Sequence, residues 1–459
     1  MKSLPPPLLT GLCQMSDAVR HPCRRLLWLA LLLVFARPAF AQPVPLPPGT
    51  SSPDQQTDEA SSPLADVESA IEAKNYPLAT ARLDVYLSAH PADARALFDR
   101  GYIEDAQGHT DAAESWYRKA IAADPKQFEA RLALGLILAS KNDPQDTDAA
   151  RDQLEAAVQL EPNPPNPAAK AQADRALARL DRTADPMAAR DALVNALKLT
   201  PETPEDTLLA AEIAEAAGNG AIAEQEYRRA LQADPSLSEA TSGLVHLLLD
   251  QKRYADAQPL VEAALRRDPD DPTLNAQSAA ILNALGKPAD ALAVLEKLHA
   301  QEPNSRSVTT MLADTCLQTG KLDEADALYQ QLLAQTPNDP DLLDDHAQIL
   351  IRQQRFAKAI EAFRKATTAR ADDVDAWSGI AFADSELHQY QDELAALSMR
   401  SKFAPETPAS LFLWATAYDN LHQTKEAADY YHRFLAAAQG KFPDQEWQAR
   451  HRLIALGSK

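Results

Sequence analysis

The sequence predicts an all-α fold: a right-handed α-solenoid of about eleven 34-residue helix-turn-helix repeats, closed by a C-terminal capping helix. Three observations support this prediction. Alanine and leucine dominate a chain with only 6% aromatic residues and 13 glycines, a composition that favours helix. Prolines recur at a constant spacing, and small and large apolar residues recur at fixed offsets from them. No run of β-branched residues indicates strands, so an α/β enzyme core is not expected.

Residues 1–41 have the pattern of a signal peptide. Arginines precede the apolar run LLWLALLLVFA (26–36), and small residues follow it, which predicts cleavage after Ala41. The apolar run is about eleven residues long, well short of the roughly 20 that span a bilayer, so an uncleaved anchor is the weaker alternative. Translation from Met1 and from Met15 are both compatible with this pattern. We therefore expect a periplasmic or secreted protein, and the sequence does not choose between the two.

The chain that remains after cleavage is strongly acidic. Residues 1–41 hold five of the 45 bases and one of the 66 acids, which leaves a net charge near −25. Such a chain repels nucleic acid and anionic lipid, so neither is an expected partner, and no membrane insertion is expected after signal cleavage. Cys316 is the one cysteine left, so we expect no internal disulfide and a buried thiol at an inward-facing position.

Residues 42–63, QPVPLPPGTSSPDQQTDEASSP, contain six prolines and almost no apolar bulk. This composition predicts a disordered linker. The repeats are expected to occupy residues 64–457.

Proline marks the 34-residue period within the repeats. Because proline lacks an amide proton and clashes with the preceding turn, each one marks the end of a helix or the start of the next. Ala371 takes the place of one expected proline. The prolines in phase are Pro91 and Pro125, then Pro167, Pro201, Pro235, Pro269, Pro303 and Pro337, and finally Pro405.

Small and large residues recur within each period. A small residue stands twelve positions before the proline and a large apolar residue eight before it, which places both on one helical face. A second helix can approach closely where the small residues lie, so each period encodes two antiparallel helices. The small residues are Ala79, Ala113, Ala189, Ala223, Ala257, Ala291, Ala325 and Ala359, and the large ones are Leu83, Tyr117, Leu193, Tyr227, Val261, Leu295, Tyr329 and Phe363.

This pattern resembles the tetratricopeptide repeat (TPR), which has small residues at the eighth and twentieth positions, Tyr, Phe or Leu at the twenty-fourth and proline at the thirty-second. Eleven such units cover roughly residues 60–441, and with the signal peptide they indicate an exported bacterial TPR protein. An insertion and the proline-rich sequence NPPNP predict a joint near residues 141–167. Glu393 departs from the pattern, because the tenth unit should have a small residue there.

The chain ends in a predicted amphipathic capping helix from Asp444 to Leu456. Asp444 is the expected N-cap, and Gly457 is expected to end the helix. The residues expected to pack on the last unit are Trp447, Leu453 and Ile454, and those expected to face water are Gln448, Arg450 and Arg452.

No catalytic motif is found: the chain has no Gly-rich phosphate loop, no G-x-S-x-G, no H-E-x-x-H and no cysteine pair. The ten histidines are spread without metal-ligand spacing. Beyond the leader, the linker and the repeats, about 18 residues remain, too few for a catalytic domain. We therefore expect a non-catalytic protein without a cofactor or metal.

The resemblance implies a binding surface. In TPR proteins the second, fifth, ninth, twelfth and thirteenth positions of each unit tend to face a concave groove that holds a peptide. In the units from residue 204 onward these positions carry eleven acids and one base. This favours a basic or amphipathic peptide as the partner, whereas the alternative is that the acids only keep the chain soluble. The candidate partner-binding residues are Asp341, Asp344, Asp375, Phe382, Phe412 and Asp419.

The sequence thus predicts a protein-interaction scaffold of the cell envelope that binds a peptide or protein in its groove. The alternative is a periplasmic TPR subunit of a polysaccharide-export or pilus assembly machine. The identity of the partner and the oligomeric state do not follow from the sequence.

Overall fold

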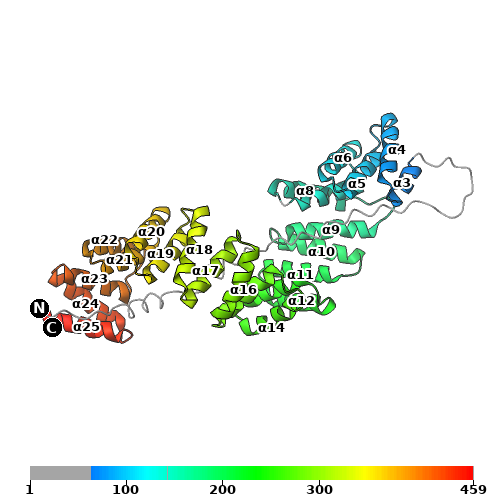
Figure 1. Ribbon diagram of the computed structural model, residues 1–459. Helices are drawn as coiled ribbons and strands as arrows, with labels where there is room; N and C mark the ends of the chain where they lie inside the picture. Colours follow the sequence, from blue (N-terminus) through cyan, green and yellow to red (C-terminus); the bar gives the residue numbers. More distant parts are fainter. Residues whose placement is uncertain (1–63, 142, 458–459) are drawn as a thin grey trace, which may run out of the picture. The chain divides into compact units, whose positions relative to one another are not determined.

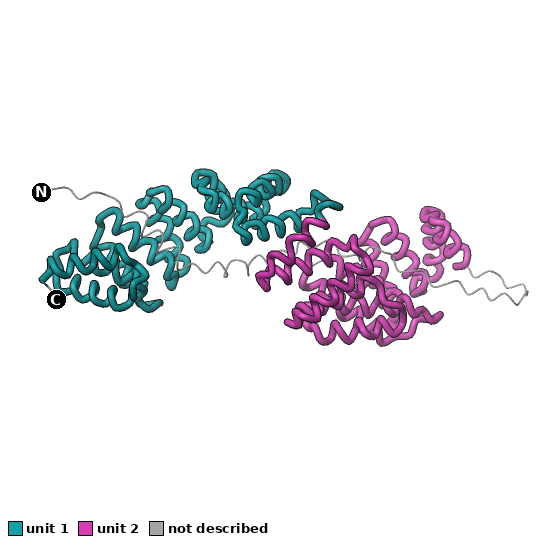
Figure 2. Tube along the Cα trace, turned by 90° about the horizontal axis from the view of Figure 1, so that it is seen from below, with its two compact units in different colours: residues 1–32, 265–459 teal, residues 33–264 magenta. Residues whose placement is uncertain are grey.

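The computed structural model describes residues 64–141 and 143–457, which form 23 α-helices and no strand (Figure 1). The predicted signal peptide, its cleavage point and the linker lie outside the described residues. The chain divides into two compact units: unit 2 holds the described residues up to 264, and unit 1 those from 265 onward (Figure 2). Among the described helices, none combines the length and the hydropathy needed to cross a membrane.

Unit 2 consists of helix pairs in chain order. Its helices are α3 (Ala65–Glu72) and α4 (Tyr76–Ala89), α5 (Ala94–Ala106) and α6 (Thr110–Ala123), α7 (Phe128–Ser140) and α8 (Pro144–Val158), α9 (Pro167–Asp181) and α10 (Pro186–Leu199), α11 (Pro204–Ala216) and α12 (Gly220–Ala233), and α13 (Ser238–Asp250) and α14 (Tyr254–Leu265). From α3 to α13, each helix packs against the next one along the chain.

Unit 1 repeats this arrangement and adds one helix. Its helices are α15 (Pro272–Ala284) and α16 (Pro288–Gln301), α17 (Arg306–Thr319) and α18 (Leu322–Gln335), α19 (Pro340–Arg352) and α20 (Phe356–Ala369), α21 (Val374–Glu386) and α22 (Tyr390–Ser401), α23 (Pro408–Asn420) and α24 (Thr424–Ala438), and α25 (Pro443–Ala455). The helical pairs and the final helix agree with the predicted all-α solenoid.

Short polar side chains begin many of the first helices. Asp339 accepts hydrogen bonds from the amides of Asp341 and Leu342 and so caps α19. Thr203 starts a capping box with Asp206 on α11. These side chains pair amides that the first helical turn leaves without partners, and proline at the first helical position needs no partner. The positions where these helices begin are therefore set by the capping side chains and the prolines.

The small and large residues identified in the sequence form the core, as predicted. Each of the eight alanines is fully buried, and the eight large residues are at most 4% exposed. Cys316 is also buried, which confirms that expectation, and burial raises the pKa of its thiol to about 11. The alanines allow the two helices of a repeat to approach, while the large residues fill the space between repeats.

Within unit 2, the region of the expected joint contains a break between α8 and α9. Three of the six residues from Glu161 to Asn166 are prolines, which have no amide proton. The apolar core nevertheless continues across the break, because one cluster of buried residues extends from Leu97 on α5 to Leu177 on α9. The helices on the two sides of the break also pack against each other.

The predicted capping helix is present as α25, but it is rotated from the expected orientation. Leu453 is buried as predicted, whereas Trp447 is 64% exposed and Ile454 is 76% exposed. The buried face instead carries Ala449 and two polar residues, Gln445 and Glu446. The N-cap is also corrected, because it is Phe442 followed by Pro443 rather than Asp444. The helix ends where expected, with Gly457 at a positive φ of 71°.

Candidate functional site

The candidate residues lie on the first helices of the last three repeats, α19, α21 and α23, all in unit 1. Asp341 begins this series near the start of α19, with a side chain that is 68% exposed. Its carboxylate accepts a hydrogen bond of 2.8 Å from Arg370, which also binds Asp373 at 2.5 Å. Arg370 therefore already neutralises part of the charge of Asp341.

Asp344 is partly buried one turn further along α19, on the same helix as Asp341. Asp375, at the start of α21, is exposed, and among the described residues it has no hydrogen bond or ion pair through its side chain. Phe382 lies two turns after Asp375 and is half-buried, with its ring edge-on to Phe356 at 6.3 Å between centroids.

Glu386 completes a line of three residues on α21. At 100° per residue, Asp375, Phe382 and Glu386 fall within about 40° of one another around the helix, so they form one stripe roughly 16 Å long. Burial raises the pKa of Glu386, and the nearby His388 lowers it by a smaller amount. We call these three residues the α21 stripe. Among the described residues its two acids form no ion pair, and its one aromatic ring is partly accessible.

Phe412 is not a surface residue, which corrects the prediction made from its position in the repeat. Its side chain is 2% exposed. It packs against Phe434 at 5.0 Å and Tyr431 at 6.3 Å between ring centroids. It belongs to the core cluster that joins α23, α24 and α25. A side chain enclosed in this way cannot anchor a partner without opening the last repeat.

Asp419 is also corrected, because it is buried and its charge is matched within the chain. Arg452 of α25 donates two hydrogen bonds of 2.7 Å to its carboxylate, one to each oxygen. The hydroxyl of Tyr431 donates a third at 3.1 Å. A bidentate arginine pair of this kind is a strong structural contact. Asp419 therefore fastens the capping helix to the last repeat and is not available to a partner.

The Tyr431–Asp419 bond is one instance of a recurring contact that the repeat pattern did not predict. A tyrosine at the twenty-fourth position of a unit donates a hydrogen bond to an acid at the twelfth. Tyr227 donates to Glu215 at 2.6 Å, and burial together with this carboxylate raises the pKa of the phenol. Tyr117 makes the corresponding contact with Asp105 at 3.5 Å. The twelve-residue spacing between tyrosine and acid is visible in the sequence and would have identified these acids as structural.

Other acids pair with arginines of a neighbouring repeat. In unit 2, Arg175 binds both carboxylate oxygens of Asp206 at 2.6 and 2.7 Å across 31 residues. In unit 1, Arg355 binds Asp326 at 2.7 Å across 29 residues. These pairs connect successive repeats, so part of the acidic charge of the chain serves the fold.

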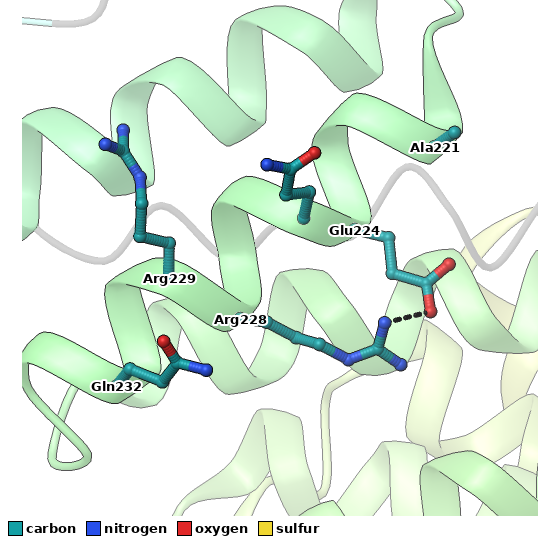
Figure 3. Close-up of a pocket in the computed structure, with 6 residues that line it drawn as sticks. Ala221, Glu224, Arg228, Arg229 and Gln232 are labelled. Carbon is teal, nitrogen blue, oxygen red and sulfur yellow. Dashed lines mark ion pairs between the residues drawn. The ribbon is translucent and has the colours of Figure 1, made fainter.

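Two hollows of the surface are lined by residues other than those of the α21 stripe. One, of about 450 Å³, follows the face of α12 opposite its buried residues (Figure 3). Its two arginines are paired: Arg228 with Glu224 at 2.5 Å, and Arg229 with Glu202 at 2.7 Å. A second hollow, of about 510 Å³, is lined by Gly320, Leu322, Asp323, Gln353 and Arg355. In the described part of the chain, no three His, Cys, Asp or Glu side chains are grouped as metal ligands would be.

Family comparisons agree with the repeat pattern. Two family models, both described as tetratricopeptide repeat, match the sequence, one at residues 174–338 and the other at 64–128, 106–167 and 345–383. Together the matched ranges cover more than half of the chain. The comparison with curated proteins gives no match.

Among solved structures, the chain is similar to a tetratricopeptide repeat protein from Parabacteroides merdae ATCC 43184, with 17% identity and a TM-score of 0.43 over 52% of this chain and 91% of that one. It is also similar to TTC0263, a thermophilic TPR protein in Thermus thermophilus, with 25% identity and a TM-score of 0.33 over 39% and 99%. A third structure is YrrB, a TPR protein with an unusual peptide-binding site, with 22% identity and a TM-score of 0.36 over 40% and 95%. The repeat period, the helix pairs and the family models lead to one conclusion: this chain belongs to the tetratricopeptide-repeat family, whose repeats support a role in protein interaction.

Proposed function

We propose that this protein is a scaffold that binds a basic or amphipathic peptide segment of a partner protein on the first helices of unit 1. The observation that carries the proposal is the α21 stripe, where Asp375 and Glu386 flank Phe382 on one face of the helix. Two acids about 16 Å apart suit basic side chains spaced along a peptide, and the ring between them suits an apolar side chain.

The charges and the ring contribute differently to binding. Unpaired surface acids attract a cationic partner over a distance of about 8 Å at physiological ionic strength, so they mainly raise the association rate. The ring of Phe382 acts after contact, when apolar surface is removed from water, so it mainly slows dissociation. Asp341 and Asp344 lie on α19, which packs against α21, and Arg370 already pairs with Asp341.

We further propose that binding takes place in the cell envelope, because the leader at residues 1–41 has the pattern of an export signal. A net charge near −25 after cleavage disfavours nucleic acid as a partner, and no catalytic step is assigned to the protein. The partner is then an envelope protein or an exported peptide with a basic segment.

Association kinetics test the proposal once affinity capture from envelope extract, followed by mass spectrometry, has identified a partner. Replacing Asp375 with Asn and Glu386 with Gln should lower the association rate several-fold at low salt, with a smaller effect at high salt. Replacing Phe382 with Ala should instead raise the dissociation rate roughly tenfold, as expected for an anchor whose truncation costs more than about 1 kcal/mol.

Glu361 provides the matched control, because it is an exposed acid on the second helix α20 without a side-chain partner among the described residues. Changing Glu361 to Gln removes one charge from the same unit but leaves the stripe intact, so it should alter both rates little. If the stripe variants and the Glu361 variant behave alike, the acids serve solubility only and the proposed site is wrong.

A further inference from the structure

The tenth repeat, α21 with α22, has an unusual core. In the other ten repeats the twentieth position is an alanine, and each of these alanines is fully buried. In the tenth repeat this position is Glu393, which is also fully buried. A carboxyl group thus occupies the place where the two helices of a repeat normally approach most closely.

A second buried acid lies in the same repeat. Asp384 on α21 is fully buried, and neither its carboxyl oxygens nor those of Glu393 make a hydrogen bond of normal geometry with the described residues. Several other buried acids are paired with arginine, for example Asp99 with Arg95 at 3.1 Å, and Asp206 with Arg175. Burying an ionised carboxyl without such a partner is costly, so these two groups favour the protonated form.

The groups around the pair do not supply a bound cation. On α21, Ser385 lowers the pKa of Glu393, while Asp384 and Glu386 raise it. On α22, Asp392 raises the pKa of Asp384, which Arg364 of α20 lowers by a smaller amount. Tyr390, at the start of α22, is a further neighbour of Glu393.

Arg400 on α22 is buried but is engaged elsewhere. It donates to the hydroxyl of Ser378 at 3.1 Å and to the carbonyl of Pro405 at 3.0 Å, and it lies 3.5 Å from Glu406, in the segment before α23. The carboxyl pair therefore faces mainly other acids.

We propose that the tenth repeat is a proton-controlled joint of unit 1, closed while Glu393 and Asp384 carry protons and loosened when they lose them. Opening α21 from α22 would displace the helix that carries Asp375 and Phe382. The joint would therefore change the surface that the α21 stripe presents, although its existence does not depend on that stripe binding a partner.

The direction of the pH effect depends on whether the folded or the unfolded repeat binds protons more tightly. Burial raises the pKa of Glu393 to about 8 and that of Asp384 to about 6, above the ordinary values of 4.5 and 3.8. The folded repeat therefore holds these protons more tightly than the unfolded one. The stability that these protons contribute to the folded repeat is greatest when the pH is below the ordinary pKa values of the two groups. It is lost as the pH rises through the raised pKa values, about 6 for Asp384 and about 8 for Glu393.

Hydrogen exchange of the full chain, read by mass spectrometry, can follow a single repeat. Between pH 5.5 and pH 8.5, after correction for intrinsic exchange rates, the protection of amides at 374–401 should fall at least about tenfold more than that at 340–369 in the ninth repeat. A carboxyl pKa that is higher by one in the folded repeat than in the unfolded one corresponds to roughly a tenfold change in the folding equilibrium. The ninth repeat is the internal reference because it has Ala359 in place of Glu393.

Three variants assign the effect to the carboxyl groups. Glu393→Ala restores the residue that the other repeats have, and Glu393→Gln keeps the size while removing the charge. Both should abolish most of the extra fall in protection, whereas Asp375→Asn, on the exposed side of α21, should retain it. Parallel changes in the two repeats of the unmodified chain would overturn the proposal. An undiminished fall in Glu393→Gln would do the same, even if the alanine variant proved unstable.

Discussion

Glycines lie where the helices of successive repeats approach one another most closely. In unit 2, a Cβ atom added at Gly243 on α13 would lie 2.5 Å from the ring of Tyr227 on α12. In unit 1, a Cβ at Gly379 would lie 2.3 Å from the ring of Phe363. In both places the large residue of one repeat rests on the backbone of the next. Glycine is therefore required there for packing.

Replacing Gly243 with Ala should destabilise unit 2 by about 1–3 kcal/mol, the usual range for overpacking a filled core. The ring of Tyr227 is fully enclosed and cannot move away without displacing α12 or α13. Urea unfolding followed by circular dichroism measures the change. Gly220→Ala is the control, because a Cβ there meets its nearest atom at an ordinary 3.5 Å. That variant should be neutral or slightly stabilising, and equal losses in both variants would contradict the packing explanation.

At this scale the sequence predicted burial well wherever the 34-residue phase applied, as for Ala223 and Tyr227. It failed for Phe412 and Asp419, because the phase assigns a position within a repeat but not what covers that position. Phe412 packs against α24 of its own repeat, as the equivalent Phe98 packs against Tyr117 in an internal repeat. Asp419 is instead covered by Arg452 of the capping helix. Which side chain covers such a position depends on how the helices pack, and the spacing of small and large residues does not encode this.

At the scale of helices, the turn within each repeat has a fixed geometry that the sequence conceals. A residue one or two positions after the first helix adopts a positive φ in most repeats. In some it is glycine, such as Gly218 and Gly320, but elsewhere it is a residue such as Lys252 or Gln354. A positive φ is unfavourable for residues other than glycine, so the packing of the two helices must impose it. Glycine spacing alone would have identified only part of these turns.

The orientation of α25 shows the same limit. Its apolar residues predicted that Trp447 and Ile454 face inward, yet both are exposed. The buried face is fixed instead by the pairing of Arg452 with Asp419 and by the close approach of Ala449, which is fully buried. A helix with few apolar residues has a weak preference for one face, so a single specific ion pair can decide its rotation.

Breaking this ion pair should loosen the capping helix. Arg452→Gln leaves the carboxylate of Asp419, 9% exposed, with Tyr431 as its remaining partner, so we expect a loss of about 2 kcal/mol from the free energy of unfolding of the last repeat. Hydrogen exchange in residues 443–455 measures it directly. Lys441→Gln, which changes an exposed base beside the helix, should have no effect. A double change of Arg452 and Asp419 should cost less than the sum of the single changes, and strict additivity would show that the pair contributes no coupling.

At the scale of the whole molecule, the sequence predicted the fold class and the repeat period but not the division into two units. The boundary falls between residues 264 and 265, at the end of α14. The 34-residue phase continues through this point without interruption, from Pro235 to Pro269 to Pro303. A boundary that leaves the period unchanged depends on how strongly particular helices pack, which the spacing of prolines does not encode.

At this scale, many of the acids that give the chain its negative charge are paired within the fold. Arginines of neighbouring repeats and tyrosine hydroxyls take up many of the acids, as at Asp206, Glu215 and Asp419. The acids that stay outside such contacts, including Asp375, are therefore better candidates for recognition than the total charge suggests. The sequence shows the excess of acids, but it does not distinguish the acids that are paired within the fold from those that are not. Pairing between residues about 30 positions apart depends on how the repeats stack.

Export is the prediction that concerns the chain as a whole. The apolar run at 26–36 is too short to remain as a membrane span, and small residues follow it, so we expect a signal peptidase to cut after Ala41. Intact mass of the protein recovered from the envelope fraction should then correspond to residues 42–459, whether translation starts at Met1 or at Met15. Replacing Ala41 with Arg, which removes the small residue at the cleavage point, should leave the leader attached and retain the protein at the membrane. A mature form that keeps residues 26–36 in the unmodified protein would contradict cleavage. A protein found only in the cytoplasm would remove the envelope from the proposed function while leaving the α21 stripe to be tested on its own.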